Sequence, residues 1–245
     1  MHSKKISVLV TTHNGKKFIR KQINSIIDSL FQHKNYEILI SDDSSTDETF
    51  QILKNIKNNK IKLFKNNFKN INQNINFLIN KSKGDYIFIS DQDDIWEIDK
   101  IKVCMHYHNL GYSFISHNFK FFENQRKPKF KKQEIKKINF LNLLYKNRIA
   151  GCTMSFHKKC IKYFNPVPLN IIYDWWIAIN IYYNLNPSKI KHLNISLLNY
   201  RVHNNNLIGN TKKSKQNIIQ KILYRIVIIF EFLKKNKFYE KNNFY

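Results

Sequence analysis

Residues 85–94 of this 245-residue chain read DYIFISDQDD. Positions 86–89 are apolar or aromatic, which is typical of a buried strand, and three aspartates follow where that strand ends. Two earlier segments have the same character, residues 6–12 (ISVLVTT) and residues 36–43 (YEILISDD). Apolar residues at helical spacing separate the strands, for example over 18–31. This alternation predicts an α/β fold with a mostly parallel sheet flanked by helices.

The rest of the chain is less regular, and its length fits one large domain or one domain with a small appendage. Gly84 is expected to end a helix, and Gly151 indicates that the backbone there closely approaches another group. Residues 123–137 are basic and suggest a surface excursion. The pattern predicts strands at 61–64, 112–122, 149–156 and 190–200, and helices around 50–56, over 72–79, from 173 onward and over 217–235.

The composition is strongly basic, with 42 Lys and Arg against 17 Asp and Glu and a formal charge of +25. Such an excess favours an anionic partner, although the abundance of Lys, Asn and Ile also fits the codon bias of an AT-rich genome. Five glycines leave no Gly-rich dinucleotide or phosphate loop. Three cysteines without a close pair argue against a disulfide scaffold and fit a reducing cytosol.

The acidic clusters follow two strands whose carboxyl ends meet at one edge of a parallel sheet, where ligands bind. If residues 91–93 stay extended, Asp91 and Asp93 face one point, and a divalent cation such as Mg²⁺ or Mn²⁺ would relieve their repulsion. Asp93 or Asp94 could instead cap a helix beginning near Ile95. The cluster at 42–47 has the same two interpretations, a capped junction or hydrogen bonds to a base or ribose.

Six motifs in order make a more specific pattern, and together it resembles the family 2 glycosyltransferases of the GT-A fold. The DQDDIW form at 91–96 is similar to the rhamnosyltransferase-like branch. His13 departs from the commoner tyrosine of the first motif. The resemblance covers roughly residues 5–210. The motifs are VLVTTHNG at 8–15, ILISDDSSTD at 38–47, DQDDIW at 91–96, AGCTM at 150–154, YDWW at 173–176 and YRVH at 200–203.

The resemblance implies a single nucleotide-sugar-binding GT-A domain over 1–210, with a donor half at 1–110 and an acceptor half at 111–210. It implies an inverting glycosyltransferase that moves a sugar from dTDP-rhamnose or a UDP- or GDP-hexose to a hydroxyl of a saccharide or lipid-linked acceptor. Such a reaction belongs to bacterial cell-surface polysaccharide or lipopolysaccharide biosynthesis. A carboxylate must take the acceptor proton, and a cation offsets the charge of the departing diphosphate.

By the same resemblance, each motif has an expected role. Asp174 is the expected general base, and burial beside the indoles would raise its pKa toward a useful range. The cation ligands are Asp93 and His203. The expected nucleotide-sugar contacts are Thr11, Asn14, Asp42, Asp43, Asp91 and Arg201, and the expected acceptor contacts are Asp94, Trp96, Trp175 and Trp176.

Plainer interpretations stay open for these residues. Tryptophan is usually buried, so the three indoles could be core residues. Asp174 could cap its own helix, and His203 could be structural. Arg201 could pair with a phosphate or with one of the aspartates.

Residues 211–245 carry nine Lys or Arg and two Glu around an apolar face. This basic amphipathic tail could lie on an anionic membrane surface or pack on the domain. Because no targeting segment is visible, we expect a cytoplasmic protein, with the option of peripheral attachment to the inner face of the membrane. The rival classes are a basic nucleic-acid-binding protein without catalysis and a nucleotidyltransferase. We expect no nucleic acid partner, since its sequence signatures are missing.

Overall fold

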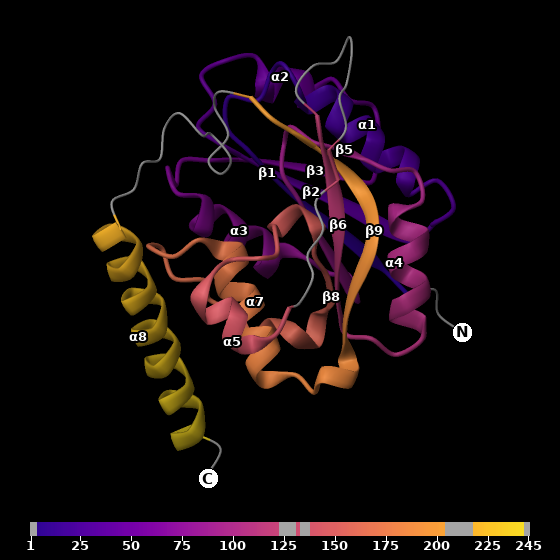
Figure 1. The fold of residues 1–245 in the computed structure, drawn as a ribbon. Helices are drawn as coiled ribbons and strands as arrows, with labels where there is room; N and C mark the ends of the chain where they lie inside the picture. The colour runs from indigo at the N-terminus through magenta and orange to yellow at the C-terminus, as the bar shows by residue number, and fades with distance from the viewer. Residues whose placement is uncertain (1–3, 123–130, 133–137, 204–217, 243–245) are drawn as a thin grey trace.

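The computed structural model describes residues 4–122, 131–132, 138–203 and 218–242 (Figure 1). Its first half is a parallel sheet in the order β3-β2-β1-β4. The strands are β1 (Ile6–Thr12), β2 (Tyr36–Asp43), β3 (Ile61–Asn66) and β4 (Tyr86–Ser90). Every residue of β1 and of β4 is buried, and β1 lies between β2 and β4, as its unbroken apolar run predicts. The predicted parallel α/β unit is therefore confirmed.

The sheet continues past β4 with mixed pairing, so the whole sheet is less parallel than the first half. β8 (Ser155–His157) is antiparallel to β4, and β6 (Phe114–Phe122) is antiparallel to β8. β9 (Ile190–Arg201) then runs parallel to β6. The two-residue strand β5 (Ile95–Trp96) pairs with β9, and β7 (Lys131–Lys132) pairs with β6. The pairing of β5 with β9 brings the segment after β4 beside the end of β9.

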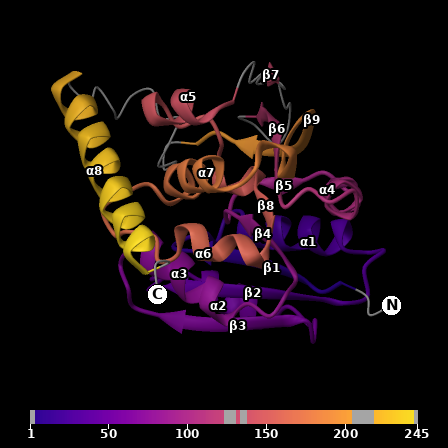
Figure 2. The same cartoon turned by 90° about the horizontal axis from the view of Figure 1, so that it is seen from below.

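Helices cover both faces of the sheet (Figure 1 and Figure 2). One apolar core packs α1 (Ile19–Ser29), α2 (Thr49–Lys54) and α4 (Lys100–Asn109) on one face. The second core lies on the opposite face and includes α3 (Ile71–Lys81), α5 (Phe140–Tyr145), α6 (Ile161–Phe164), α7 (Tyr173–Asn184) and α8 (Ile218–Asn242). Three short 3-10 helices cover Gly151–Thr153, Lys158–Cys160 and Pro187–Lys189.

Two predictions about local structure were wrong in part. The strand expected at 149–156 is a 3-10 turn over Gly151–Thr153 that leads into the short strand β8. Gly84 does not end α3, which stops at Lys81; it packs against the backbone of Ser7, where a side chain would not fit. Most of the excursion expected at 123–137 lies outside the described residues.

The C-terminal helix α8 packs on the domain through one face. Ile228 and Phe232 are buried in the same core as α7, and the Arg225 guanidinium donates from Nε to the Tyr145 carbonyl at 2.8 Å. The packing alternative for the tail is thus realised on this face. In the described part of the chain, no helix combines the length and apolar character needed to cross a bilayer.

Candidate active site

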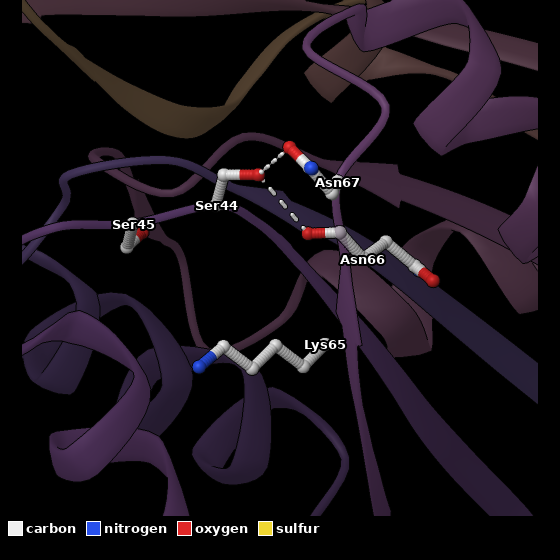
Figure 3. A pocket seen from close by; sticks show the side chains of 5 residues that line it. All are labelled: Ser44, Ser45, Lys65, Asn66 and Asn67. Carbon is white, nitrogen blue, oxygen red and sulfur yellow. Dashed lines mark hydrogen bonds between the residues drawn. The ribbon is translucent and has the colours of Figure 1, made fainter.

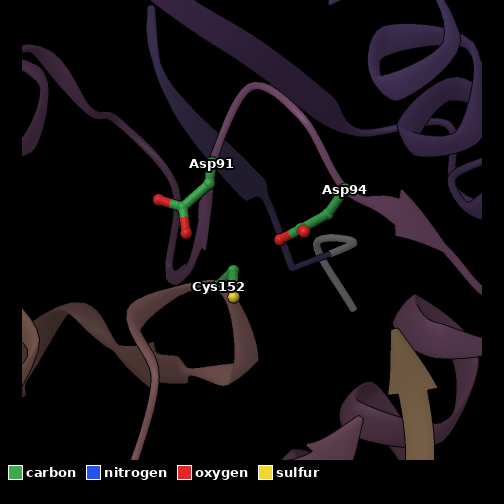
Figure 4. Close-up of side chains that lie close together, drawn as sticks. All are labelled: Asp91, Asp94 and Cys152. Atoms are coloured by element: carbon green, nitrogen blue, oxygen red, sulfur yellow. The ribbon is translucent and has the colours of Figure 1, made fainter. Parts of the chain in front are cut away.

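The segment 91–94 bends between β4 and β5 instead of continuing as a strand. Its side chains therefore do not alternate as expected. Asp91 and Asp94, rather than Asp91 and Asp93, offer oxygen atoms that lie together with the Cys152 sulfur within 4.8 Å of one another (Figure 4). The helix-capping alternative for Asp93 and Asp94 is wrong, because Ile95 starts a strand and the next helix begins at Lys100.

Burial sets the protonation of this cluster. Desolvation, with the nearby charge of Asp93, raises the pKa of Asp91 to about 6 and that of Asp94 well above its usual value. The pKa of the Cys152 thiol is also raised, first by burial and then by both carboxylates. Asp94 is 1% exposed and accepts a hydrogen bond from the Arg201 backbone, so the acceptor contact expected of Asp94 stays a prediction at a buried residue.

Lys100 is a buried cation beside this cluster, and the sequence reasoning missed it. Its ammonium group donates to the Cys152 carbonyl at 2.6 Å and lies 3.8 Å from the centre of the Trp96 ring. Burial lowers the pKa of Lys100 to about 8, although nearby carboxylates favour its charged form. We infer that Lys100 holds the two carboxylates in one place. The sequence could not reveal this role, because the apolar spacing did not predict the helix in which Lys100 lies.

Asp93 points the other way, toward the end of β9. The Asp93 Oδ2 atom lies 2.8 Å from His203 Nε2, and the His203 ring stacks on Phe18 with centroids 4.8 Å apart. Arg201 braces this pair, since its Nε donates to the Asp93 carbonyl at 2.7 Å and its guanidinium lies between the Phe18 and Phe122 rings. Arg201 is 3% exposed, so it supports the aspartate segment rather than facing a donor directly.

Asp174 lies in the first turn of α7 and is 4% exposed. Its carboxylate accepts hydrogen bonds from Asn147 Nδ2 at 2.8 Å and from the Gly151 backbone at 3.2 Å. Burial, with the charge of Asp91, raises the pKa of Asp174 to about 7. Asp174 is not the N-cap of α7, which is Ile172. The carboxyl is therefore poised to accept a proton near neutral pH.

Tyr173 connects the two acidic segments. Its hydroxyl donates to Asp91 Oδ1 at 3.2 Å, from the residue next to Asp174. A side chain at Gly151 would collide with the Tyr173 ring and hydroxyl. The close approach predicted from this glycine is thus confirmed. We expected four aspartates, Asp43, Asp91, Asp93 and Asp174, to converge in one pocket. Asp91 lies near Asp174, to which Tyr173 connects it, whereas Asp43 hydrogen-bonds to the backbone of residues 68–70.

The cluster after β2 serves mainly to shape loops. Asp42 is fully buried and accepts hydrogen bonds from Thr12 Oγ1 at 2.8 Å and Ser45 Oγ at 2.6 Å. Asp43 accepts from three successive backbone N–H groups at residues 68–70, between 2.7 and 3.1 Å. Asp42 therefore shapes the turn, and the donor contact expected of it stays a prediction.

The first motif ties these loops together. The Asn14 side-chain oxygen accepts from the Thr46 backbone at 2.8 Å, and Asn14 has a positive φ of 50°. The His13 backbone and the Gln92 side-chain amide exchange two hydrogen bonds, both of 2.9 Å. Thr11 is nearly buried at the end of β1. Hydrogen bonds therefore connect the ends of β1, β2 and β4, and Gln92 joins them although sequence reasoning gave it no role.

A pocket of about 550 Å³ opens at the ends of β2 and β3 (Figure 3). The Ser44 hydroxyl donates to Asn67 Oδ1 at 2.7 Å and to the Asn66 carbonyl at 3.2 Å on its wall. The pocket lies two strands away from Asp91, because β1 separates β2 from β4. It is lined by Ser44, Ser45, Lys65, Asn66 and Asn67.

The three tryptophans are buried, as the alternative of core residues predicts, and the acceptor contacts expected of them stay predictions. Trp96 and Trp176 are 3% and 1% exposed, and Trp175 is 7% exposed. The indole N–H of Trp175 donates to the Leu143 carbonyl at 2.5 Å, and that of Trp176 donates to the Phe164 carbonyl at 2.8 Å. Their ring faces pack against protein, so they support α4 and α7 from inside.

Comparisons with known proteins place the sequence among characterised relatives. The sequence pattern of "Glycosyl transferase family 2" matches residues 7–165. The chain is 28% identical over 236 residues to Escherichia coli WfaP, named UDP-Glc:alpha-D-GlcNAc-diphosphoundecaprenol beta-1,3-glucosyltransferase, with 92% of this chain and 91% of WfaP covered. It is 28% identical over 258 residues to the dTDP-rhamnosyl transferase RfbG of Shigella flexneri, with 95% and 81% covered.

Solved structures add the fold. The crystal structure of S. aureus TarS in complex with UDP-GlcNAc superposes with a TM-score of 0.67 at 21% identity. The match covers 81% of this chain and 59% of that TarS chain. These matches favour the glycosyltransferase interpretation over the nucleic-acid-binding and nucleotidyltransferase alternatives.

Proposed function

This chain belongs to Glycosyl transferase family 2, and we propose that it transfers a sugar from a nucleoside diphosphate to a hydroxyl of a lipid-linked or saccharide acceptor, with inversion. The observation that carries the proposal is Asp174, a buried carboxyl with a pKa of about 7, close to the aspartates at the end of β4. WfaP and RfbG, similar over most of their length, use UDP-glucose and dTDP-rhamnose by name. The reaction would belong to bacterial cell-surface glycan synthesis.

The donor is proposed to lie along the sheet edge from the pocket to Asp93. Neighbouring strands are about 4.8 Å apart, so the ends of β2 and β4 are roughly 10 Å apart, which suits a nucleoside diphosphate. The base and ribose would occupy the pocket beside Ser44 and Asn67, with Asp43 fixing the loop that forms its wall. Thr11 and Asp91 would border the ribose and diphosphate.

Asp93 and His203 fit a divalent cation, because one carboxylate oxygen and one imidazole nitrogen already lie 2.8 Å apart and could turn to a shared ion. This mixed set favours Mn²⁺ over Mg²⁺. When bound, such a cation offsets the charge that develops on the leaving diphosphate. Phe18 and Arg201 hold the two ligands in place from behind.

Asp174 would take the proton of the acceptor hydroxyl as that oxygen attacks the anomeric carbon. Asn147 and Gly151 orient the carboxylate, and the Tyr173 hydroxyl keeps Asp91 turned toward the same space. Attack from the base side, with the diphosphate leaving on the other side, gives inversion.

Titration calorimetry with UDP, dTDP and GDP, with and without Mn²⁺, tests the donor site. We expect micromolar binding of one nucleotide that requires Mn²⁺ and is lost in Asp93→Asn. Asn67→Trp should fill the pocket and weaken the same nucleotide, whereas Asn59→Trp, an exposed asparagine before β3, should not. Equal nucleotide binding by the two tryptophan variants would show that the nucleoside does not occupy this pocket. Failure of every nucleotide to bind would contradict the proposed function.

A further inference from the structure

The C-terminal helix α8 is apolar on the side that faces away from the domain. Leu223, Ile226, Phe230 and Leu233 are 55%, 56%, 64% and 52% exposed. A helix packed on a domain ordinarily turns a polar side to water. Here the outward side carries a continuous apolar surface over three turns, and surfaces of this kind mark interaction sites. We name it the outer face of α8, formed by Ile222, Leu223, Ile226, Ile229, Phe230 and Leu233.

The outer face cannot turn inward, because the opposite side of the helix is anchored. Ile228 is fully buried, and Phe232 packs against Tyr183 and Phe140 with centroids 4.9 and 5.6 Å apart. The Tyr224 hydroxyl accepts a hydrogen bond from the Ile172 backbone at 2.5 Å. Figure 1 shows α8 running along the outside of the molecule beside α5 and α7. Within the described residues, the outer face is therefore left exposed.

The two simplest partners for the outer face are a second copy of this chain and a lipid surface, and the charge of the protein distinguishes them. A second copy of this chain would bring together two molecules of formal charge +25, each with nine Lys or Arg and two Glu in residues 211–245. An anionic lipid surface instead attracts such a segment. Lys234, adjacent to Leu233 on the helix, is exposed and can reach lipid headgroups while the apolar side chains enter the acyl boundary.

The anchor of α8 also lies next to the proposed base. Tyr224 contacts the backbone of Ile172 and the Trp175 ring, whose centroid is 5.8 Å from its own. These two residues flank the Tyr173–Asp174 pair in sequence. A surface covering the outer face would therefore lie about one helix diameter, roughly 10 Å, from the start of α7.

We propose that the outer face of α8 lies in the interface of an anionic membrane, and that this attachment presents Asp174 to an acceptor held in that membrane. The second half of the proposal rests on the proposed function. The first half does not, because lipid binding needs neither a donor nor an acceptor.

Vesicle flotation tests the attachment with the full chain and with vesicles that contain no acceptor. Phosphatidylglycerol–phosphatidylcholine vesicles should float the protein, pure phosphatidylcholine vesicles should not, and 0.5 M salt should weaken the binding. Ile226→Gln with Phe230→Gln should lower the bound fraction at least about tenfold. The matched control is Ile98→Gln with Phe31→Gln, an exposed isoleucine and phenylalanine elsewhere, 66% and 84% exposed. Equal binding by the two double variants would overturn the proposal.

Two further measurements test whether the outer face itself contacts the vesicles and whether a second copy of the chain covers it instead. The three native cysteines are buried, so an environment-sensitive dye on Ile226→Cys reports on the outer face alone. Its emission should shift to the blue with anionic vesicles, whereas a dye on Phe31→Cys should not respond. Light scattering should find a monomer; a dimer that Ile226→Gln with Phe230→Gln dissociates would identify a second copy as the occupant instead. If the protein binds vesicles but binds none of the nucleotides in calorimetry, the proposed function fails and the attachment stands.

Discussion

The pKa values of buried carboxyl groups are shifted in opposite directions at the two ends of the parallel strands. At the amino end, Glu37 is 3% exposed and accepts from Lys62 and Lys5 at 3.0 and 3.1 Å. Ser7 Oγ and the Lys83 backbone add two hydrogen bonds of 2.8 Å. Burial alone would raise the pKa of Glu37, but these donors outweigh it and bring the pKa to about 2.

At the carboxyl end, Asp91 and Asp174 have pKa values raised to about 6 and about 7. Burial is the first cause there, and neighbouring carboxylates add to it. The lysines at the amino end neutralise their carboxylate within the fold. At the other end Lys100 only partly offsets the burial of the acidic residues, and raised pKa values of this kind are common at functional sites. The same sheet thus carries a neutralised carboxylate at one end and the proposed site at the other.

The largest expected effect comes from the carboxyl end. Asp174→Asn should lower kcat by roughly 10²- to 10⁴-fold, because general base catalysis contributes about that much. Nucleotide binding should survive, as measured by calorimetry with UDP or dTDP. Asp99→Asn, at an exposed aspartate before α4, serves as the control and should keep its activity. Near-normal turnover in Asp174→Asn would show that Asp174 is not the general base.

A second test removes the cation beside the acidic cluster. Lys100→Met should lower the free energy of unfolding by about 3–5 kcal/mol at pH 7, because breaking a buried charge arrangement leaves uncompensated carboxylates. Urea unfolding followed by tryptophan fluorescence gives the value. Lys102→Met, two residues along the same helix at an exposed position, should change it little. A similar free energy of unfolding for Lys100→Met and Lys102→Met would mean that the Asp91 and Asp94 carboxyls are uncharged when Lys100 is absent.

A third test concerns the amino end. Glu37→Gln should cost about 1–3 kcal/mol, since it leaves Lys5 and Lys62 without their carboxylate partner. Activity per folded molecule should be unchanged, because Glu37 lies at the opposite edge of the sheet from Asp174. If Glu37→Gln lost activity while keeping its full stability, Glu37 would have a role in the reaction, and the distinction between the two ends of the strands would be wrong.

The smallest effects are those of pH, and their signs differ between the ends. Glu37, with a lowered pKa, contributes stability that is present above pH 4.5 and is lost as pH falls toward 2. Asp174, with a raised pKa, binds more protons when folded, so its contribution falls as pH rises from about 4 to 7. Melting temperatures from pH 3 to 8 should show the acid loss shrink in Glu37→Gln. Turnover should rise through pH 7 as Asp174 ionises.

Sequence reasoning predicted the carboxyl end better than the amino end. Apolar runs that end in aspartates indicated both the sheet and its functional edge, because strand direction places all those ends together. Glu37 gave no such signal, since one glutamate in a strand shows neither its burial nor the lysines that approach it from β3 and from the residue before β1. The burial of Asp42 and the tryptophans could not be predicted, because burial depends on tertiary packing, which motif order does not encode. Lys100 was missed because α4 has two lysines and two histidines among its apolar positions.

The contact between Gly151 and Tyr173 has an evolutionary consequence. One missing methyl group at position 151 makes room for the phenol that reaches Asp91. A lineage that acquired alanine at 151 would have to shrink residue 173 as well, giving up the hydroxyl at the same time. The two positions should therefore covary as a linked pair, and a homologue with a side chain at the first should orient its aspartate by some other donor.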